Sequence, residues 1–359
     1  MQAEKLISAH RGAAENPPNR FEKIHLEPDA DWNPDDDADG GRPPGPRTQF
    51  FKDHSQTIIA RNDSPDIGFQ TSLNPYRGCE HGCIYCYARP FHEYLGFSAG
   101  LDFESKIMVK EDAPELLRRE LSSPKWQPQV IFLSGVTDCY QPVERKLKLT
   151  RRCLEVLAEF RNPVFIVTKN RLVTRDIDLL AELARHHAVG VWLSITTLDS
   201  ELRQVMEPRT SLPAARLAAI RELAAAGIPV GVNVAPIIPG LTDHETPAIL
   251  KAAAEAGATS AGYTVVRLPH AVAPLFEKWL ETHFPDQKEK VFNRLRAMHG
   301  GKLYDSQWGK RFGGEGIFAE QIAQMFEVAR RKAGIKNEGG ELSTAAFRRA
   351  GGTQLSLFS

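Results

Sequence analysis

Three cysteines close together form the most chemically informative stretch of the chain. Cys79, Cys83 and Cys86 lie in "NPYRGCEHGCIYCYARP" with C-x3-C-x2-C spacing. Thiolates hold iron–sulfur clusters, and a four-iron cluster usually takes four of them. A cluster held by only three protein ligands leaves one iron free to bind a small molecule. The motif therefore predicts a catalytic cluster rather than one that only stores electrons. Gly78 and Gly82 fit a tight loop around such a group.

Zinc is the alternative metal for these cysteines. One of His54, His81 or His92 would complete a Cys3His site. Zinc sites more often use paired C-x2-C spacings with a second knuckle further along the chain. Cys139 and Cys153 are remote and unpaired, so the sequence offers no second knuckle. The spacing and the glycines favour the cluster.

Composition narrows the class of protein. The chain has 359 residues, with Lys+Arg and Asp+Glu both at 45, which argues against binding to nucleic acid by bulk charge. No apolar run is long enough to span a membrane, and the first residues lack the apolar core of a secretory signal. Five cysteines without an export signal indicate a reducing compartment. We expect a cytoplasmic protein.

The cysteine loop precedes alternating strand-like and helix-like segments. Short apolar, β-branched runs predict strands at 130–135, 164–169, 189–196, 229–238 and 261–268. Helical periodicity predicts helices at 150–161, 174–187, 212–227 and 244–257. Strands that alternate with helices form βαβ units, so the fold class is α/β with a parallel sheet, closed or partly closed.

The flanking segments have other textures. Residues 1–50 are rich in Asp, Pro and Gly, which predicts a disordered leader. After the α/β region of 51–270, helical periodicity predicts a helical extension over 271–335. Residues 336–359 carry glycine pairs and little periodicity, which predicts a flexible tail.

The cysteine loop, with Tyr85 just before the third cysteine, resembles that of radical S-adenosylmethionine (SAM) enzymes. The resemblance covers about residues 70–270 and implies a partial (β/α)6 barrel. It implies that Cys79, Cys83 and Cys86 hold a [4Fe-4S] cluster, whose open iron takes the amino and carboxylate groups of SAM, with Tyr85 beside the cofactor. One electron, from a flavodoxin- or ferredoxin-like donor, then cleaves SAM to methionine and a 5′-deoxyadenosyl radical that abstracts hydrogen from the substrate.

The remaining cofactor contacts are expected at the carboxyl ends of the parallel strands. Ser134, Thr137 and Asp138 follow the 130–135 strand, where the family often carries Gly-Gly-Glu for the methionine amino group. This chain departs from that pattern, so these three are substitutes by position only. Lys169 ends the next strand and is placed to pair with a carboxylate.

Two further strands contribute candidates. Ser194 and Thr196 offer hydroxyls for ribose or carboxylate, and Arg209 is expected to clamp a carboxylate with Glu207 as its partner. Ile238 is expected to flank the adenine. The plain alternative for the hydroxyls is a turn or cap role.

Longer strings, among them "TDCYQPVE" and "APIIPGLTD", resemble the subgroup related to spore photoproduct lyase, which splits a thymine dimer in DNA. That enzyme uses a cysteine as hydrogen donor, which makes Cys139 a candidate catalytic residue and Tyr263 a candidate relay. A free cysteine is equally a small buried hydrophobe. Cys153 lies in the apolar stripe of a helix, so we assign it to the core.

The terminal "QLSLF" resembles the peptide by which bacterial repair proteins dock on the DNA sliding clamp. Gln354, Leu355, Leu357 and Phe358 match, and a flexible linker would let them reach roughly 20–25 Å from the body. This favours DNA as the substrate, in a repair role. The alternatives are a radical SAM enzyme that modifies a protein, RNA or metabolite, and a zinc-binding adaptor.

Overall fold

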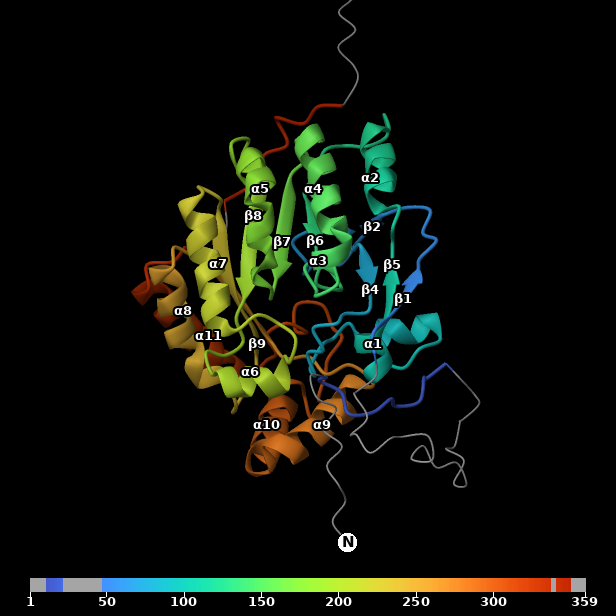
Figure 1. Ribbon diagram of the computed structural model, residues 1–359. Coiled ribbons are helices and arrows are strands. Elements are labelled where there is room, and N and C mark those ends of the chain that lie inside the picture. Colours follow the sequence, from blue (N-terminus) through green and yellow to red (C-terminus); the bar gives the residue numbers. More distant parts are fainter. Residues whose placement is uncertain (1–10, 22–46, 337–339, 350–359) are drawn as a thin grey trace, which may run out of the picture.

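A twisted, mostly parallel sheet forms the centre of the protein (Figure 1). The computed structural model describes residues 11–21, 47–336 and 340–349, and the structural statements below concern these residues. The strands run in the order β10-β9-β8-β7-β6-β3-β2, all parallel except β2, which is antiparallel to β3. Their bounds are β2 Ile59–Arg61, β3 Thr71–Leu73, β6 Ile131–Leu133, β7 Val164–Thr168, β8 Val189–Ser194, β9 Val230–Ile237 and β10 Ser260–Val265.

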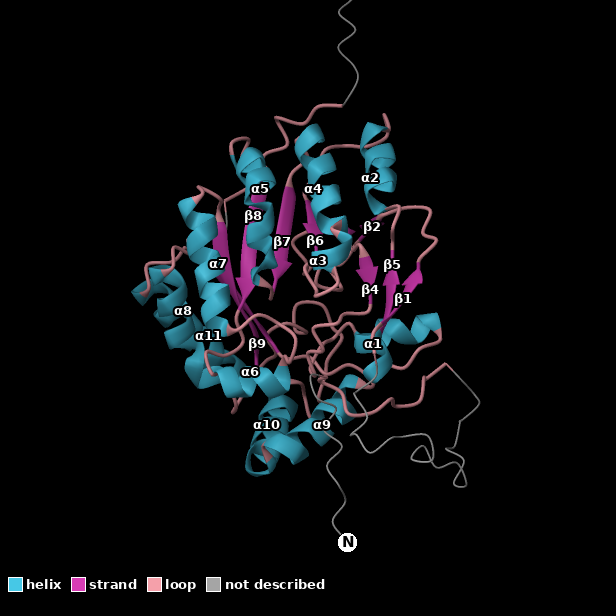
Figure 2. Cartoon of the chain, in the orientation of Figure 1, coloured by secondary structure: helices cyan, strands magenta, loops and turns pink. Residues whose placement is uncertain are grey.

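Six parallel strands with outer helices confirm the predicted partial (β/α)6 barrel. The edge strands β2 and β10 do not pair with each other, so the barrel is open. Figure 2 shows helices along one side of the strands. The helices that follow the strands are α2 Ala113–Ser122, α4 Leu149–Phe160, α5 Ile177–Ala184, α6 Ser200–Met206, α7 Pro213–Ala225 and α8 Thr246–Glu255. Each of the five strands predicted from the sequence is present.

Alternation along the strands separates the outer core from the inner face. In β7, Val164, Ile166 and Thr168 are buried, whereas Phe165 and Val167 are only partly so. Because successive side chains of a strand point to opposite faces, one set packs under the helices and the other lines the barrel interior.

Aromatic rings fill the inner face. Phe69 stacks on Phe132 with ring centroids 4.1 Å apart, and Phe165 lies 5.6 Å from Phe132 and 5.5 Å from Trp192. Trp192 needs the glycine beside it, because a Cβ at Gly231 would lie 2.3 Å from its Nε1. The interior at this level is a packed wall, which leaves the carboxyl edge of the sheet for a ligand.

A smaller sheet and short helices flank the barrel. The small sheet has the order β1-β5-β4, and three long helices follow the barrel as the predicted extension. These elements are β1 Gln49–Lys52, β4 Tyr76–Arg77, β5 Lys106–Val109, η2 Arg89–Leu95, α1 Leu101–Ser105, α3 Glu144–Leu147, η3 Arg171–Asp176, η4 Asp243–Glu245, α9 Val272–His283, α10 Pro285–Met298 and α11 Ile317–Lys332. In the part of the chain that is described, no helix is both long and apolar enough to cross a bilayer.

The structure corrects the expectation of a flexible tail for residues 340–349. The Ser343 N–H donates to the His187 carbonyl at 2.8 Å, and the Arg348 N–H to the Phe160 carbonyl at 2.9 Å. The Phe347 ring lies 6.3 Å from that of Phe160. His187 and Phe160 precede β8 and β7, so this segment crosses the amino-terminal end of the barrel, where Figure 1 shows it in red. The clamp-like residues Gln354, Leu355, Leu357 and Phe358 lie outside the described residues.

The amino-terminal prediction also needs correction. Residues 11–21 are not a disordered leader, because they pack along the cysteine loop, η2 and α1 through hydrogen bonds with Glu104, Asp102 and Glu93. Residues 1–10 and 22–46 lie outside the described residues.

We predict that Phe347→Ala lowers the free energy of unfolding by about 1–3 kcal/mol, because it removes a partly buried ring from the core. Chemical denaturation would measure the loss. Glu341→Ala, at an exposed position of the same segment, serves as the control and should change little. Equal stability of the Phe347 variant and the wild type would show that the segment is not anchored by this ring.

Candidate active site

The cysteine loop follows β4 and takes its shape from two glycines. Gly78 and Gly82 have φ of +78° and +67°, a left-handed conformation that residues with a Cβ rarely adopt. The Cys79 N–H donates to the Phe103 carbonyl at 2.9 Å, and the Ile84 N–H to the Met206 carbonyl at 3.1 Å. The loop is therefore tied to α1 on one side and to α6 on the other.

The three motif cysteines are unpaired and shielded from water. Cys79 and Cys83 are buried and Cys86 is partly buried. Burial raises the pKa of all three thiols. The negative charges of Asp138, Cys86 and Cys83 raise the pKa of Cys79 further. Three buried thiols in one loop stay protonated unless a metal stabilises their thiolates. Iron does so in a cluster, so this set of ligands fits a cluster.

A site for a single metal ion and a four-iron cluster require different spacings between their ligands. Among the described residues, no three His, Cys, Asp or Glu side chains are grouped closely enough to hold one metal ion. A Cys3His zinc site requires such a group around a single ion. A [4Fe-4S] cluster requires cysteines that stand apart, because each thiolate binds a different iron.

A buried carboxylate, Glu207, joins the loop to the carboxyl ends of two strands. Its Oε1 accepts hydrogen bonds from the Tyr85 hydroxyl and from Thr196 Oγ1, the latter at 2.7 Å, and lies 3.1 Å from Lys169 Nζ. Its Oε2 is paired with Arg216 of α7. Tyr85, Lys169 and Thr196, all predicted cofactor contacts, are thus brought together beside the cysteines.

Glu207 remains ionised in this environment. Burial by itself would raise its pKa, but the charges of Arg216 and Lys169 and the hydrogen bonds from Tyr85 and Arg216 hold the pKa far below its usual range. Lys169 Nζ also donates to the Ala235 carbonyl at 2.7 Å and lies 5.6 Å from the centre of the Tyr85 ring. The ammonium therefore stands over the tyrosine of the cysteine loop.

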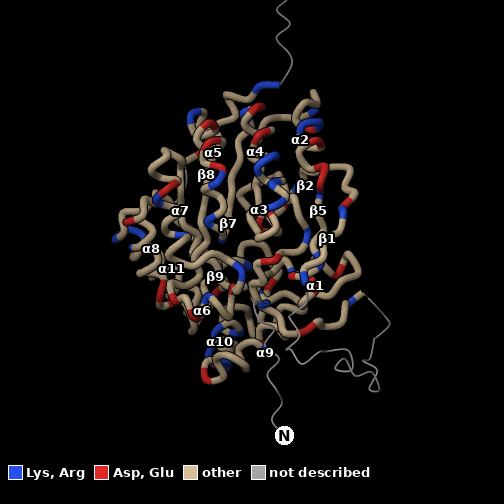
Figure 3. The backbone as a smooth tube through the Cα atoms, viewed as in Figure 1, with Lys and Arg blue, Asp and Glu red and all other residues tan. Residues whose placement is uncertain are grey.

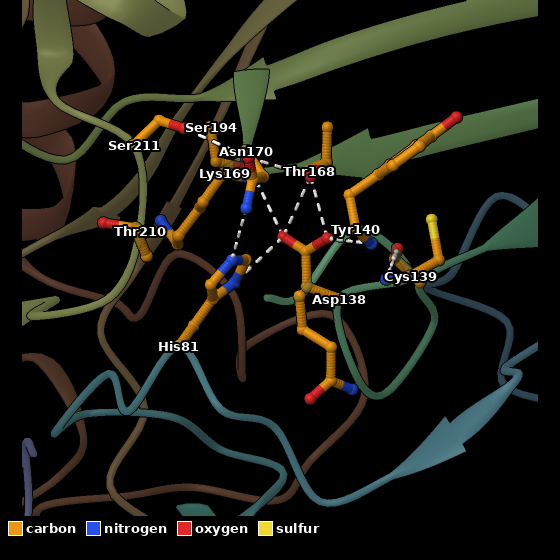
Figure 4. Close-up of polar contacts among 12 residues, drawn as sticks. His81, Asp138, Cys139, Tyr140, Thr168, Lys169, Asn170, Ser194, Thr210 and Ser211 are labelled. Atoms are coloured by element: carbon orange, nitrogen blue, oxygen red, sulfur yellow. Dashed lines mark hydrogen bonds and ion pairs between the residues drawn. The ribbon is translucent and has the colours of Figure 1, made fainter. Parts of the chain in front are cut away.

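Asp138 forms a second polar centre, shown in Figure 4. Its carboxylate accepts hydrogen bonds from Thr168 Oγ1 at 2.8 Å and from the Lys169 N–H at 2.8 Å, and lies 3.4 Å from His81 Nδ1. The amide nitrogen of Asn170 lies 3.2 Å from His81 Nε2. The two ring nitrogens of His81 therefore lie between Asn170 and Asp138.

Both oxygens of Asp138 are therefore occupied by protein donors. Burial would raise the pKa of Asp138, but His81 and hydrogen bonds from the Lys169 and Tyr140 N–H groups keep it below its usual range. In this structure Asp138 braces the cysteine loop against the end of β7, rather than pointing a free carboxylate at a ligand.

Other predicted contacts are placed differently from expectation. Arg209 pairs with Glu80 at 3.0 Å and not with Glu207, so the predicted Arg209–Glu207 pair is wrong. Arg209, in the loop after α6, pairs with Glu80 of the cysteine loop, whereas Arg216 on α7 reaches back to Glu207. Ser194 contributes its backbone carbonyl, which accepts from Arg216 at 2.8 Å.

The turn after β6 uses its polar side chains internally. Ser134 has φ of +74°, and its hydroxyl accepts from the Cys139 N–H at 2.9 Å. Thr137 Oγ1 donates to the Tyr76 carbonyl at 2.9 Å. The hydroxyls of these residues stabilise the turn, which is the turn or cap role given above as the alternative for hydroxyls at strand ends.

Three candidates lie away from the Lys169–Glu207 cluster. Ile238 and Cys139 are fully buried in the main core, and in Figure 4 the Cys139 sulfur points away from the Asp138 carboxylate. The Tyr263 ring packs on Phe326 of α11 with centroids 4.6 Å apart. The structure therefore does not place a thiol or phenol of this set at the site. Cys153 lies in the core, as predicted.

Loops cover the open side of the barrel between its edge strands. Arg311 Nε pairs with Asp66, in the loop between β2 and β3, at 2.9 Å, and the Gly309 N–H donates to the same carboxylate at 3.1 Å. The Phe312 carbonyl accepts from the Val265 N–H of β10 at 2.8 Å. Residues 309–312 therefore bridge the two edges that the sheet leaves unpaired.

A stack of cationic and aromatic groups stands beside the cysteine loop at this opening. The Arg267 guanidinium lies 4.3 Å from the centre of the Tyr87 ring and 4.6 Å from that of Phe312. Tyr87 follows Cys86 directly, and its hydroxyl donates to the Gly135 carbonyl at 2.9 Å.

Sequence reasoning missed several members of the site. The missed side chains are Arg89, Asn170 and Arg216, and His81 was expected only as a zinc ligand. His81 and Arg89 lie inside the cysteine motif itself, which was the available signal. Asn170 directly follows Lys169, and nothing in its local pattern separates Arg216 from an ordinary helix residue.

Comparison with known proteins now decides the family. Residues 73–253, about half of the chain, match the sequence profile of the Radical SAM superfamily. The chain belongs to the radical SAM superfamily. As a member, this enzyme uses a [4Fe-4S] cluster and SAM and needs a reductant that supplies electrons.

Its relatives include proteins with and without a named activity. An uncharacterized protein of Mycobacterium tuberculosis (strain H37Rv) is 39% identical over 235 residues, which cover 65% of this chain and 68% of that protein. A protein of Pseudomonas phage M6 named Radical SAM Nalpha-GlyT isomerase is 26% identical over 224 residues, covering 62% of this chain and 44% of that protein.

The fold of this radical SAM enzyme is similar to that of a solved structure, spore photoproduct lyase complexed with dinucleoside spore photoproduct. The TM-score is 0.54 at 16% identity, with 79% of this chain and 77% of that chain covered.

We predict that Glu207→Gln lowers the free energy of unfolding by about 3–5 kcal/mol at neutral pH, because it leaves the buried Arg216 and the nearby Lys169 without their counter-charge. The pKa of Glu207 is lowered on folding, so its ionised form stabilises the protein above the unfolded value of about 4.3 and this contribution fades as pH falls. The difference between wild type and variant should therefore shrink in acid.

Denaturant unfolding at a series of pH values measures this. Glu222→Gln, which removes an exposed partner of Arg171, is the control and should cost little at any pH. A pH-independent difference for Glu207→Gln would contradict the ion-pair explanation.

Proposed function

We propose that Cys79, Cys83 and Cys86 are the protein ligands of the [4Fe-4S] cluster, and that the carboxyl edge of β7 and β8 receives SAM. When bound and reduced, the cluster supplies the electron that cleaves the sulfonium of SAM to give methionine and the adenosyl radical. The observation that carries the proposal is that Tyr85, inside the cysteine motif, is joined through Glu207 to Lys169 and Thr196 at that edge.

The residues of this edge have separate tasks in the proposal. The Lys169 ammonium lies near Tyr85 of the cysteine loop and contacts Thr196, Ala235 and Glu207. The carboxylate of a ligand would replace one of these three contacts. Glu207 and Arg216 hold Lys169 and Tyr85 in place, and Asp138 holds the backbone of Lys169. Ser134, Thr137, Ser194, Arg209 and Ile238 then act as structural supports rather than as ligands.

We further propose that the substrate is DNA or a nucleotide and that the enzyme acts in repair. The name of one solved structure of similar fold supports it, because that protein is a lyase complexed with a dinucleoside photoproduct. The Arg267 stack beside Cys86 also supports it, since guanidinium and aromatic faces are surfaces on which bases stack.

Charge does not single out a nucleic-acid face. Figure 3 shows Lys and Arg interspersed with Asp and Glu over the described helices and loops. Tight binding to long DNA would therefore need help, and the proposed clamp-like peptide at Gln354, Leu355, Leu357 and Phe358 is one such means. A flavodoxin- or ferredoxin-like reductant and a cytoplasmic location complete the proposal.

For the cluster ligands, we predict that Cys83→Ala prevents formation of a stable SAM-responsive cluster, whereas Cys153→Ala retains one because that thiol is a core residue. Anaerobic reconstitution with iron and sulfide, followed by electron paramagnetic resonance with and without SAM, reports this. Lys169→Met should keep the cluster signal but weaken its change on adding SAM. A wild type without a cluster signal would refute the proposal.

For the substrate, we predict that 5′-deoxyadenosine formation by the reduced wild-type enzyme rises with DNA that carries modified or damaged thymine. Undamaged DNA of the same sequence is the control, and fractions of protein, RNA and small metabolites test the alternative. Stimulation by one of those fractions, with none by either DNA, would assign the enzyme to the other substrate class.

A further inference from the structure

The segment Arg11–Phe21 runs along the outer side of the cysteine loop, and we call it the covering strap. In Figure 1 it is the dark-blue coil beneath α1. Its backbone contacts the loop closely, because a Cβ at Gly12 would lie 1.7 Å from the Gly82 carbonyl oxygen and 3.2 Å from the Ile84 nitrogen. Only glycine allows this approach, since any side chain at position 12 would push the strap off the loop.

One buried carboxylate connects the strap to the loop. The N–H groups of Gly12 and Ala13 both donate to the fully buried Glu104, at 2.9 and 2.8 Å. Consecutive N–H groups of this kind form a small anion-binding concavity. Arg11 adds a hydrogen bond to the Glu104 carbonyl. A Cβ at Gly82 would lie 2.7 Å from the same carboxylate, so the carboxylate lies against the cysteine loop as well as against the strap.

The other partner of Glu104 is Arg89, which shapes the loop from inside. Arg89 is fully buried, and it pairs with Glu104 at 2.5 Å while donating to the Cys83 carbonyl at 2.9 and 3.1 Å. It also donates to the carbonyls of Ala99 and Gly100. The strap therefore supplies two of the donors that this buried carboxylate requires, in addition to Arg89.

Further contacts extend the attachment along the elements that flank the loop. The Asn16 and Asp102 groups exchange two hydrogen bonds, at 2.9 and 3.0 Å. Asn19 donates to the Glu93 carbonyl of η2 at 2.9 Å, and Arg20 pairs with Glu93 at 3.1 Å. The strap is thus held along its length by polar groups, with Ala13 and Asn19 buried.

We propose that the covering strap is part of the cluster site and shields the cluster from oxidants and chelators, with Glu104 as the positioning residue that holds strap and loop together. This rests on the proposed cluster ligation by Cys79, Cys83 and Cys86. The strap acts by limiting the opening of residues 79–86 and by closing their outer side to solvent, so its loss changes the lifetime of the cluster more than its assembly.

The test compares Gly12→Ala with Gly68→Ala in the full chain. A Cβ at Gly68 meets no atom within 4 Å and its φ is not positive, so this is a matched change in open space. After anaerobic reconstitution, exposure to air or to an iron chelator should bleach the visible absorbance of the Gly12→Ala cluster on the order of tenfold faster than that of wild type, as expected for two lost hydrogen bonds. Gly68→Ala should match wild type.

Hydrogen exchange supplies a second readout that needs no activity. Peptides covering residues 79–86 should exchange faster in Gly12→Ala, with or without the cluster, while α4 and α7 exchange as in wild type. A wild type that takes up no cluster would refute the proposed function. The strap proposal alone would be overturned if wild type takes up a cluster but Gly12→Ala and Gly68→Ala bleach at the same rate. Exchange of residues 79–86 would also have to be unchanged in Gly12→Ala.

Discussion

The ionised carboxylate of Glu207, removed from water, constrains the whole carboxyl edge of the barrel. A charge in that position is tolerable only when several donors reach it at once. Those donors come from the cysteine loop, the ends of β7 and β8, and α7. Because each donor sits on a different element, the elements can pack tightly only in one mutual arrangement. The same contact that neutralises Glu207 therefore sets the distance between the cysteines and the strand ends.

Sequence reasoning succeeded where the physical signal is local or follows from sheet geometry. β-branched runs identify the long strands, cysteine spacing identifies the cluster motif, and the rule that strand ends meet at one edge brings Lys169 and Thr196 to the site. β2 and β4, with three and two residues, are too short to show a period. Arg209 was expected beside Glu207, but the arginine that pairs with Glu207 is Arg216, nine positions along the chain on α7.

The covering strap and the anchored segment 340–349 show a different limit of sequence reasoning. Composition counts apolar side chains, so a segment rich in Asp, Pro and Gly, or one with glycine pairs and little periodicity, predicts disorder. Here the attachment comes from backbone N–H groups that donate to a carboxylate some ninety positions away. It also comes from the carbonyls of Phe160 and His187, just before β7 and β8, which accept from the carboxyl-terminal segment. Such partners cannot be recognised until the tertiary fold is known.

Anchoring of residues 340–349 also determines how the enzyme would be held by a partner that grips its last residues. Arg349 is fixed at the amino-terminal end of the barrel by a hydrogen bond to the Trp126 carbonyl at 3.0 Å. Four residues separate it from Gln354, a stretch that spans at most about 17 Å over five peptide units. A partner bound there would lie close to the amino-terminal end of the barrel. The cysteine loop, at the carboxyl ends of the strands, would then lie on the side of the barrel opposite that partner.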